Sequence, residues 1–533
     1  MTYSRPGVYV SETLLPAPIT AIGTANAAGA AMGAFAKGPE AVTLVTSWYD
    51  FVKKFGGFNA AFPATFGVNQ FFQNGGTELY VRRVLGDGAS AAAVNLPSVT
   101  VGVNVGVATA KNKGAEGNNL RVRISKVGAG SLYNVTVYEE VLTSELGTND
   151  ANGANDLIVE NFNNVVFDNP NSSDYVASVV NALSNYIVLT MNDGVDDAPA
   201  VQSVGAVLPL TSGDDGDAPV ASDFSALLPL DGSSEFDELS RPLVLFAPEA
   251  YAKFFLDLGD EADAIDELGT LQSALIDYAT ATTGFAVLDT APNLSVPDAI
   301  AYATSLGNTP SSQAAAYYPN YFIQDPLSRN RGTLRKVAPA SAVAGLYLAT
   351  DKAFGPFKAP AGTATTVRGA VALERPFTPA DLDSLNTGQY EGEGTVYGSP
   401  VNAIRQVPGA GIVVMGARTL LQDGTANRYV NTRRSLIYIK KQLENITQFA
   451  IFENNDFRLW TRLNTVIGVF LNEYRNQGGL RGATPADAYF VKVDAENNTP
   501  ESIASGQVNI EVGVALEYPA EFVVINLSQI AGN

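Results

Sequence analysis

Strand and helix patterns alternate along residues 241–350, and this alternation limits the possible folds more than any other feature of the sequence. Apolar strand patterns are expected at 243–246, 285–288 and 315–318, and helical patterns at 262–280, 296–305 and 340–350. Strands joined through helices pair in parallel. We therefore expect an α/β domain with a parallel sheet, formed by residues 23–89 together with residues 238–400.

The stretch between these two segments, residues 90–237, has a different pattern. Short alternating strands such as 120–124 and 133–138 are separated by Gly, Asn and Asp clusters, and one helix is expected near 172–183. Such spacing is typical of an all-β domain. No Lys or Arg occurs between Val127 and Ser240, so this domain should present an acidic face. We expect a β-sandwich-like domain inserted into the α/β domain.

The C-terminal part, residues 401–516, carries the clearest helices. Apolar residues recur at intervals of three and four from Leu436 to Ala450 and again from Trp460 to Tyr474, which gives each helix one apolar stripe. A strand with period-two alternation follows at 508–518. Lys and Arg outnumber Asp and Glu along the helices. We expect an α+β domain with a basic helix flank.

Both ends of the chain are predicted to be extended arms, at residues 1–22 and 517–533. In the first, Pro6 and Gly7 break helix, while Val8, Tyr9 and Val10 favour a strand. In the second, a strand whose face is formed by Val523, Ile525 and Leu527 follows Pro519. An uncovered apolar edge strand either folds back onto its own domain or pairs with another chain.

The composition excludes several classes of chemistry. The sequence contains no His and no Cys, which removes Ser-His and Cys-His nucleophile pairs and the commonest metal ligands. The formal net charge of −21 opposes binding to nucleic acids and anionic membranes. The N-terminus shows no export signal and the Ala/Gly run at 25–36 is too short to span a bilayer. We expect a soluble protein made in a cytoplasm.

Candidate catalytic and metal-binding motifs are weak. The acidic turns at 193–197 and 213–217 lack the ligand spacing of an EF-hand, and 409–411 lacks the Lys and Ser/Thr of a phosphate loop. Asp289 ends an apolar strand, where α/β enzymes place catalytic carboxylates, but its expected partners are missing and a turn or helix-cap role is favoured. We therefore predict no catalytic, cofactor-binding or metal-binding residues.

A series of short motifs runs along the two ends of the chain and the α/β middle. The N-terminal ones are Arg5-Pro6-Gly7-Val8-Tyr9-Val10, Gly75-Gly76 and Tyr80-Val81-Arg82-Arg83-Val84. The later ones are Ala314 to Pro319, Ala344 to Tyr347, Lys358 to Gly362, Val401 to Arg405, Gly416 to Leu420, Tyr429 to Arg434, Phe452 to Asn455 and Tyr518 to Val523. In this order the motifs resemble those of contractile tail sheath proteins from myophages and related phage-tail-like injection systems.

The resemblance implies a structural protein rather than an enzyme. Sheath proteins stack as hexameric rings around a tail tube and contract to drive the tube through a cell envelope. Their middle domain is similar to a subtilisin-like α/β fold without activity, their inserted domain lies outermost, and their C-terminal domain contacts the tube. The implied partners are other copies of the chain, the tube protein, and baseplate and terminator proteins. The implied location is a virion tail assembled in a host cytoplasm and released by lysis.

The same resemblance assigns two sets of site residues. The arms would join neighbouring subunits by strand addition, through Pro6, Gly7, Val8, Tyr9, Val10, Tyr518, Pro519, Glu521, Phe522, Val523, Ile525 and Leu527. The basic helix flank would meet an acidic tube surface through Arg433, Arg434, Lys440 and Lys441.

Two other classes of function stay open from the residues alone. One is a hydrolase-like enzyme on the α/β domain that uses carboxylates such as Asp289, which a convergent group of carboxylates in a pocket would favour. The other is a surface-array or adhesion protein, which the acidic composition suits and the absence of an export signal disfavours.

Overall fold

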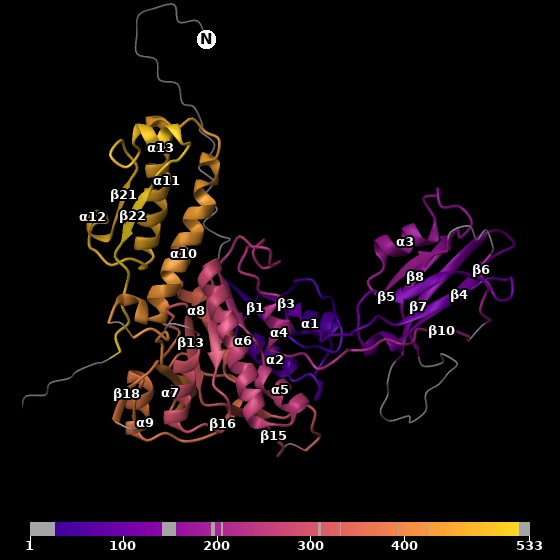
Figure 1. Cartoon of the computed structure of the whole chain (residues 1–533), viewed down its shortest axis with the longest axis horizontal. Helices are drawn as coiled ribbons and strands as arrows, with labels where there is room; N and C mark the ends of the chain where they lie inside the picture. The colour runs from indigo at the N-terminus through magenta and orange to yellow at the C-terminus, as the bar shows by residue number, and fades with distance from the viewer. Residues whose placement is uncertain are drawn as a thin grey trace, which may run out of the picture.

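The structure is a computed structural model that describes residues 27–140, 156–192, 198–203, 206–307, 311–330, 332–392, 394–422 and 424–521. Three parts can be distinguished in Figure 1. An α/β middle domain lies at the centre, a β-rich inserted domain projects to one side, and a C-terminal lobe of long helices rises from the middle domain.

The middle domain is built on an eight-stranded sheet with the order β2-β3-β1-β11-β12-β13-β19-β20. The strands are β2 (Thr43–Val45), β3 (Leu79–Arg83), β1 (Ala28–Gly33), β11 (Leu243–Phe246), β12 (Phe285–Asp289), β13 (Ala314–Tyr318), β19 (Val401–Val407) and β20 (Gly411–Val414). The strands from β3 to β19 run parallel, and β2 and β20 are antiparallel at the two edges. The predicted parallel α/β sheet is confirmed.

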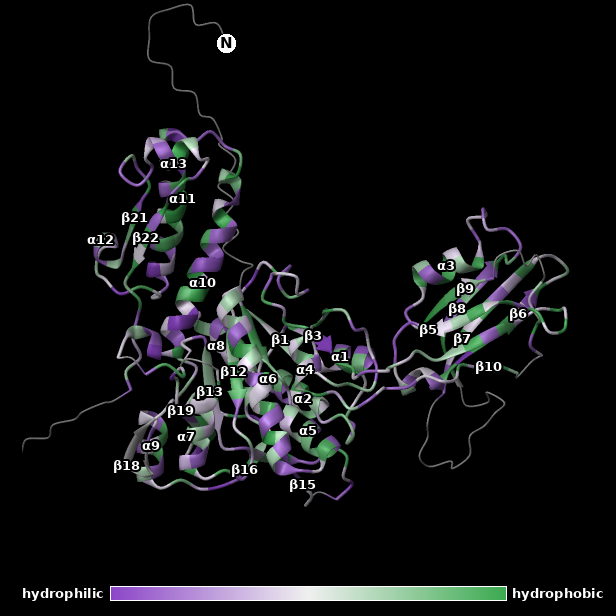
Figure 2. Cartoon of the chain, viewed as in Figure 1, coloured by the Kyte–Doolittle hydropathy of each residue, from purple (hydrophilic) through white to green (hydrophobic). Residues whose placement is uncertain are grey.

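Both faces of this sheet are covered, as expected of parallel strands that are buried on each side. In β11, Leu243 and Leu245 point to one apolar cluster, whereas Val244 and Phe246 point to the other. Helices α4 (Ala221–Ser225), α5 (Ala250–Leu258), α6 (Glu261–Thr282), α7 (Val296–Ser305) and α9 (Pro379–Thr387) cover the first face. Helices α1 (Trp48–Phe55), α2 (Ala64–Gln73) and α8 (Ala340–Phe354) cover the second. Figure 2 shows the apolar strands between these helices.

Two predicted boundaries differ from the structure. Strands β19 and β20 extend the large sheet, so residues 401–414 belong to the middle domain and not to the C-terminal part. Phe224, Leu228 and Phe236 lie in the middle-domain core, so the inserted domain ends before α4 and not at 237. The C-terminal part of the middle domain also contains α9 and three short strands, β16 (Ala370–Leu373), β17 (Gln389–Gly392) and β18 (Gly394–Tyr397).

The inserted domain has its own apolar core, to which two antiparallel sheets contribute. One sheet has the order β10-β6-β7-β8 and the other β4-β5-β9. The strands are β4 (Ala93–Pro97), β5 (Asn104–Ala110), β6 (Leu120–Val127), β7 (Leu132–Glu140), β8 (Asp156–Val165), β9 (Ile187–Met191) and β10 (Leu208–Pro209), with helix α3 at Val176–Leu183. The two predicted strands and the predicted helix are thus present.

The C-terminal lobe consists of two long helices and a small sheet. Helix α10 (Val430–Thr447) starts in the middle-domain core with Val430 and Ile437 and continues into the lobe with Ile439. Helix α11 (Phe457–Asn476) buries Leu463, Ile467, Phe470, Leu471 and Tyr474. The smaller elements are α12 (Pro485–Ala488), β21 (Tyr489–Lys492), α13 (Pro500–Ala504) and β22 (Glu511–Val514).

Candidate functional site: assembly surfaces

The C-terminal lobe carries a small antiparallel sheet that packs against α11. In this sheet β21 pairs with β22, with Tyr489 opposite Val514 and Lys492 opposite Glu511. The alternating residues Ile510, Val512, Val514 and Leu516 pack against the α10–α11 core, as their period of two predicts. Within the described residues the sheet has only these two strands. A two-stranded sheet is stable only against other structure, and its outer edges are suited to pairing with a further strand.

The described part of the predicted C-terminal arm contacts this chain itself. The Glu517 carbonyl accepts a hydrogen bond from the Thr432 hydroxyl at 3.0 Å, and the ring of Tyr518 lies 6.3 Å from that of Tyr429. Glu521 forms a two-pronged ion pair with Arg418, with the Nε–Oε1 distance 2.9 Å.

Tyr518 and Glu521 therefore contact the middle domain of the same chain, and the assignment of Tyr518, Pro519 and Glu521 to an inter-subunit contact stays a prediction. The other predicted arm residues lie outside the described residues: Pro6, Gly7, Val8, Tyr9, Val10, Phe522, Val523, Ile525 and Leu527.

Arg434 is a buried residue and not a surface one. Its guanidinium forms a two-pronged ion pair with Asp351 on α8, with one N–O distance of 3.0 Å, and lies 4.5 Å from the centre of the Tyr347 ring. The two side chains of the pair are 4% and 5% exposed. Burial raises the pKa of Asp351, and the positive charge of Arg434 opposes this shift. The pair fastens α10 to the middle domain, so the prediction that Arg434 meets a tube surface is wrong for this conformation.

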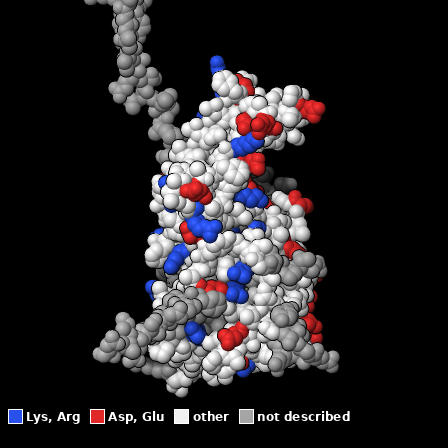
Figure 3. All heavy atoms as spheres, turned by 90° about the vertical axis from the view of Figure 1, so that its left-hand side faces the viewer, with Lys and Arg blue, Asp and Glu red and all other residues white. Residues whose placement is uncertain are grey.

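The other three predicted tube-contact residues also have partners in this chain. Arg433 donates to the Gln313 side chain, Lys440 donates to the Thr283 hydroxyl at 2.8 Å, and Lys441 pairs with Glu444 at 3.2 Å. Lys440 and Lys441 line a cavity of about 330 Å³ at the junction of the lobe with the middle domain. On the face shown in Figure 3, basic and acidic side chains are interspersed, and no continuous basic patch is visible.

A pair of carboxylates lies at the C-terminal edge of the large sheet. Asp289, at the end of β12, accepts a hydrogen bond from the Ala340 amide at 2.6 Å, and Glu249 accepts one from the Ala338 amide at 2.8 Å. Burial raises the pKa of Asp289 to about 7. Burial and the nearby Asp289 together raise the pKa of Glu249 well above its usual range. Both residues line a cavity of about 400 Å³.

This pair is the arrangement that the enzyme hypothesis requires, and the sequence pattern revealed only one of its members. Asp289 caps α8 by accepting the Ala340 amide, as the helix-cap interpretation predicts. Glu249 is missed because it lies in a Pro-Glu-Ala segment without periodicity, 40 residues upstream of Asp289. Among the described residues, no three Asp or Glu side chains converge to hold a metal ion. None of the described helices combines the length and apolar character needed to cross a bilayer.

A family profile and two curated proteins match the chain in part. Residues 422–530 match the family described as Phage tail sheath C-terminal domain. The tail sheath protein of Vibrio phage KVP40 is 26% identical over 170 residues, which cover 32% of this chain and 23% of that protein. The tail sheath protein of Salmonella phage ViI is 24% identical over 135 residues, which cover 25% and 20%. The matches thus span about a quarter or less of each curated relative.

Solved structures with the same fold cover nearly the whole chain. The helical sheath of the anti-feeding prophage in its contracted state is 20% identical, with a TM-score of 0.56, and the match covers 99% of this chain and 100% of that one. The sheath tail protein of Listeria innocua is 14% identical, with a TM-score of 0.58 and coverages of 92% and 95%. The matched proteins are structural sheath proteins and not enzymes. The family match in the C-terminal part and the shared fold together confirm the resemblance of this chain to contractile tail sheath proteins.

Proposed function

We propose that this chain is the sheath subunit of a contractile tail, and that it polymerises as stacked hexameric rings around a tail tube. The match of residues 422–530 to the tail sheath C-terminal domain is the observation that carries the proposal. Contraction of the sheath would drive the tube through a target envelope. Its partners would be further copies of the chain, the tube protein, and baseplate and terminator proteins at the two ends. Its location would be an assembled tail.

Strand addition is the proposed link between subunits. The β21–β22 sheet has only two strands among the described residues, and its alternating apolar face already packs on α11. The strand-prone segments Val8–Val10 and Val523–Leu527 have the alternation needed to add to such an edge. Each main-chain hydrogen bond contributes about 0.5–1.5 kcal/mol net, so a few of them hold an arm while the subunit bodies rotate.

The C-terminal arm would leave the subunit from Glu521. Arg418 holds Glu521 on the middle domain. Only the residues after Glu521, and not the whole 517–533 segment, would therefore extend to a neighbouring subunit. The tube contact is proposed for the C-terminal lobe without Arg434. Arg433, Lys440 and Lys441 stay as predicted contacts, and the ion pair of Lys441 with Glu444 is of the exposed kind that is weak and readily released.

Deletion of Met1–Glu12, or replacement of Val523 and Ile525 by Asp, is expected to abolish polymerisation and leave a soluble folded monomer. Buried carboxylates and missing backbone partners both prevent strand addition. Negative-stain electron microscopy of the purified protein shows whether tubes form. Val99→Asp with Val101→Asp is the matched control, because these valines are 62% and 99% exposed in the inserted domain. Full-length tubes from either arm variant would rule out the arm hypothesis.

A further inference from the structure

Lys336 of the middle domain is held between a carboxylate and a side-chain amide. Its Nζ atom donates to Glu374 Oε1 at 2.7 Å and to Asn293 Oδ1 at 2.8 Å. Lys336 lies on β15 (Leu334–Val337), Glu374 directly follows β16, and Asn293 lies in the loop between β12 and α7. Three segments that are 38 to 81 residues apart in the sequence thus meet at one nitrogen atom.

The backbone around Asn293 holds its side chain at this position. The Asn293 amide donates to the same Glu374 Oε1 atom at 2.9 Å, and its φ of 63° lies in the left-handed region, which Asn adopts more readily than most residues. The next residue is also fixed, because the Leu294 carbonyl accepts a hydrogen bond from the Tyr318 hydroxyl. The Cγ atom of Asn293 lies one carbonyl bond, about 1.2 Å, beyond the oxygen that Lys336 contacts.

The carboxylate of Glu374 is placed to move protons. Its side chain is 9% exposed, and its Oε2 atom is buried without a hydrogen-bond partner, so this oxygen is free to carry a proton. A carboxylate within hydrogen-bond distance of an amine has the geometry of a general base. Glu374 contacts the Lys336 amine and the Asn293 backbone through one oxygen and keeps the other for proton transfer.

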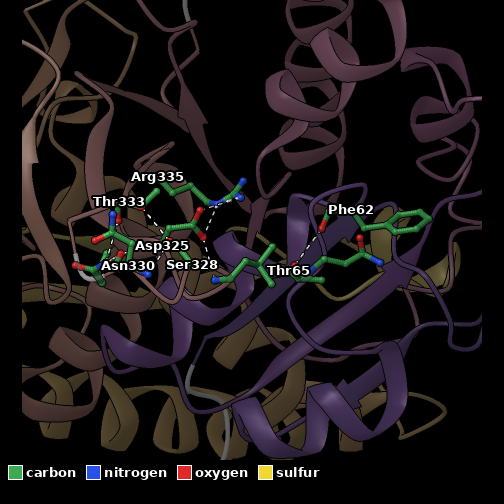
Figure 4. A network of polar contacts seen from close by, with 10 residues as sticks. Phe62, Thr65, Asp325, Ser328, Asn330, Thr333 and Arg335 are labelled. Carbon is green, nitrogen blue, oxygen red and sulfur yellow. Dashed lines mark hydrogen bonds and ion pairs between the residues drawn. The ribbon is translucent and has the colours of Figure 1, made fainter. Parts of the chain in front are cut away.

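Arg335, the neighbour of Lys336 on β15, does not compete for Glu374. Successive side chains of a strand point to opposite faces. The Arg335 guanidinium pairs with Asp325 at 3.3 Å, and Figure 4 shows the two side chains joined across the turn that connects β14 (Tyr321–Gln324) with β15. Among the described residues, Glu374 forms an ion pair with Lys336 alone.

We propose that Lys336 and Asn293 form an isopeptide bond, with Glu374 as the group that moves the protons. Lys336 passes one proton to Glu374 and attacks the Asn293 Cγ atom as a neutral amine. The Nζ–Cγ bond forms, the Cγ–Nδ2 bond breaks, and Glu374 delivers the protons to the leaving nitrogen. The net reaction converts one ammonium group and one primary amide into a secondary amide and an ammonium ion, so it needs no oxidant or reductant.

The bond would tie the loop at the C-terminal edge of the large sheet to the small sheet with the order β15-β14-β16. Asn293 and Lys336 are 43 residues apart, so the cross-link would remove loop-closure entropy from the unfolded chain, as a disulfide does. The sequence contains no Cys. A bond between Lys and Asn is therefore a covalent cross-link that this chain can form without disulfides.

The intact mass of the purified full-length chain tests the proposal. The cross-linked chain should weigh less than its sequence predicts by the mass of one ammonia molecule, and tandem mass spectrometry of a digest should identify a branched peptide that contains Asn293 and Lys336. Lys336→Arg keeps the positive charge without the nucleophilic amine, and Glu374→Gln keeps an acceptor for the Asn293 amide without the base. Both should have the full sequence mass. Asp325→Asn, which removes the ionic partner of Arg335 on the same strand, is the matched control and should keep the loss.

The branched peptide of the unmodified chain decides the test even where a variant fails to fold, which circular dichroism detects. A full sequence mass of the unmodified chain after incubation at mildly alkaline pH overturns the proposal. A mass loss that remains in Lys336→Arg, without a branched peptide, assigns the loss to a succinimide at another Asn and also overturns it. A cross-link that still forms in Glu374→Gln overturns the role of Glu374. None of these measurements depends on polymerisation, so the sheath function is tested separately.

Discussion

At the scale of single residues, the buried pair Arg434–Asp351 decides how the C-terminal lobe is attached. Both side chains are almost fully buried, and the guanidinium also stacks on Tyr347, whose hydroxyl lies 2.5 Å from that of Tyr317. A buried ion pair adds little net stability compared with an apolar pair of the same volume, but removing one partner leaves an uncompensated charge. The pair therefore specifies the position of α10 more than it adds stability.

Arg434→Met should lower the free energy of unfolding by about 3–5 kcal/mol, because Asp351 is left buried without its partner. The stability of this variant should rise as the pH is lowered from neutral. Burial raises the pKa of Asp351 above that of the unfolded chain, so the folded state binds the proton more tightly. Urea denaturation at several pH values measures both effects. Lys441→Met, which breaks the more exposed pair with Glu444, should cost less than about 1 kcal/mol. A similar small loss in Arg434→Met would contradict the prediction.

At the scale of elements, most of the α/β body follows from local sequence pattern. Strand β11 and helix α7 have the predicted bounds, and Ser47 accepts from the Asp50 amide as the N-cap of α1. These elements are predictable because periodicity and caps are local signals. By contrast, the sequence pattern places β19 in the wrong part, since its paired residues in β13 lie 85 positions earlier and no local pattern records that pairing. The burial of Arg434 was missed for the same reason.

The connection between the large sheet and the inserted domain depends on Arg83 at the end of β3. Its guanidinium is buried and donates to the carbonyl groups of Phe35, Ala36, Gly38 and Lys113, with Asp215 3.7 Å away. Lys113 and Asp215 come from the inserted segment, whereas the other three carbonyls belong to the middle domain. One side chain therefore fixes the two parts to each other.

Arg83→Met should loosen this connection, because the buried carbonyl groups of Phe35, Ala36 and Gly38 lose their donor and each costs about 1–3 kcal/mol when left unsatisfied. Limited proteolysis should then cleave the segments around residues 86–92 and 211–217 faster than in the unmodified chain. The adjacent Arg82→Met is the matched control, since Arg82 loses a single ion pair with the more exposed Glu235. Equal cleavage rates in the two variants would show that Arg83 does not hold the connection.

At the scale of the whole molecule, the inserted domain has a core of its own, and the two ends of the inserted segment lie next to each other. Its core shares no residue with the two cores of the middle domain. The two ends of the insertion meet, since the Asp217 amide donates to the Asp87 carbonyl at 2.8 Å and the Ser90 amide to the Asp214 carbonyl at 3.0 Å. Because the ends already touch, a short linker can replace the insertion without strain or a large loop-closure cost.

Replacement of residues 88–216 by a short Gly-Ser linker should therefore give a folded middle domain and C-terminal lobe. The loss in stability should be limited to the contacts that cross between the two parts, which include those of Arg83 with Lys113 and Asp215 and the ion pairs Lys37–Glu139 and Glu40–Lys113. If the chain polymerises through its arms, the shortened protein should still form tubes, with a smaller outer diameter than the full-length protein in negative-stain images. Thermal unfolding followed by circular dichroism distinguishes a failure to fold from a failure to polymerise. A folded shortened protein without tubes would show that the inserted domain takes part in assembly, and an unfolded one that the cores depend on each other.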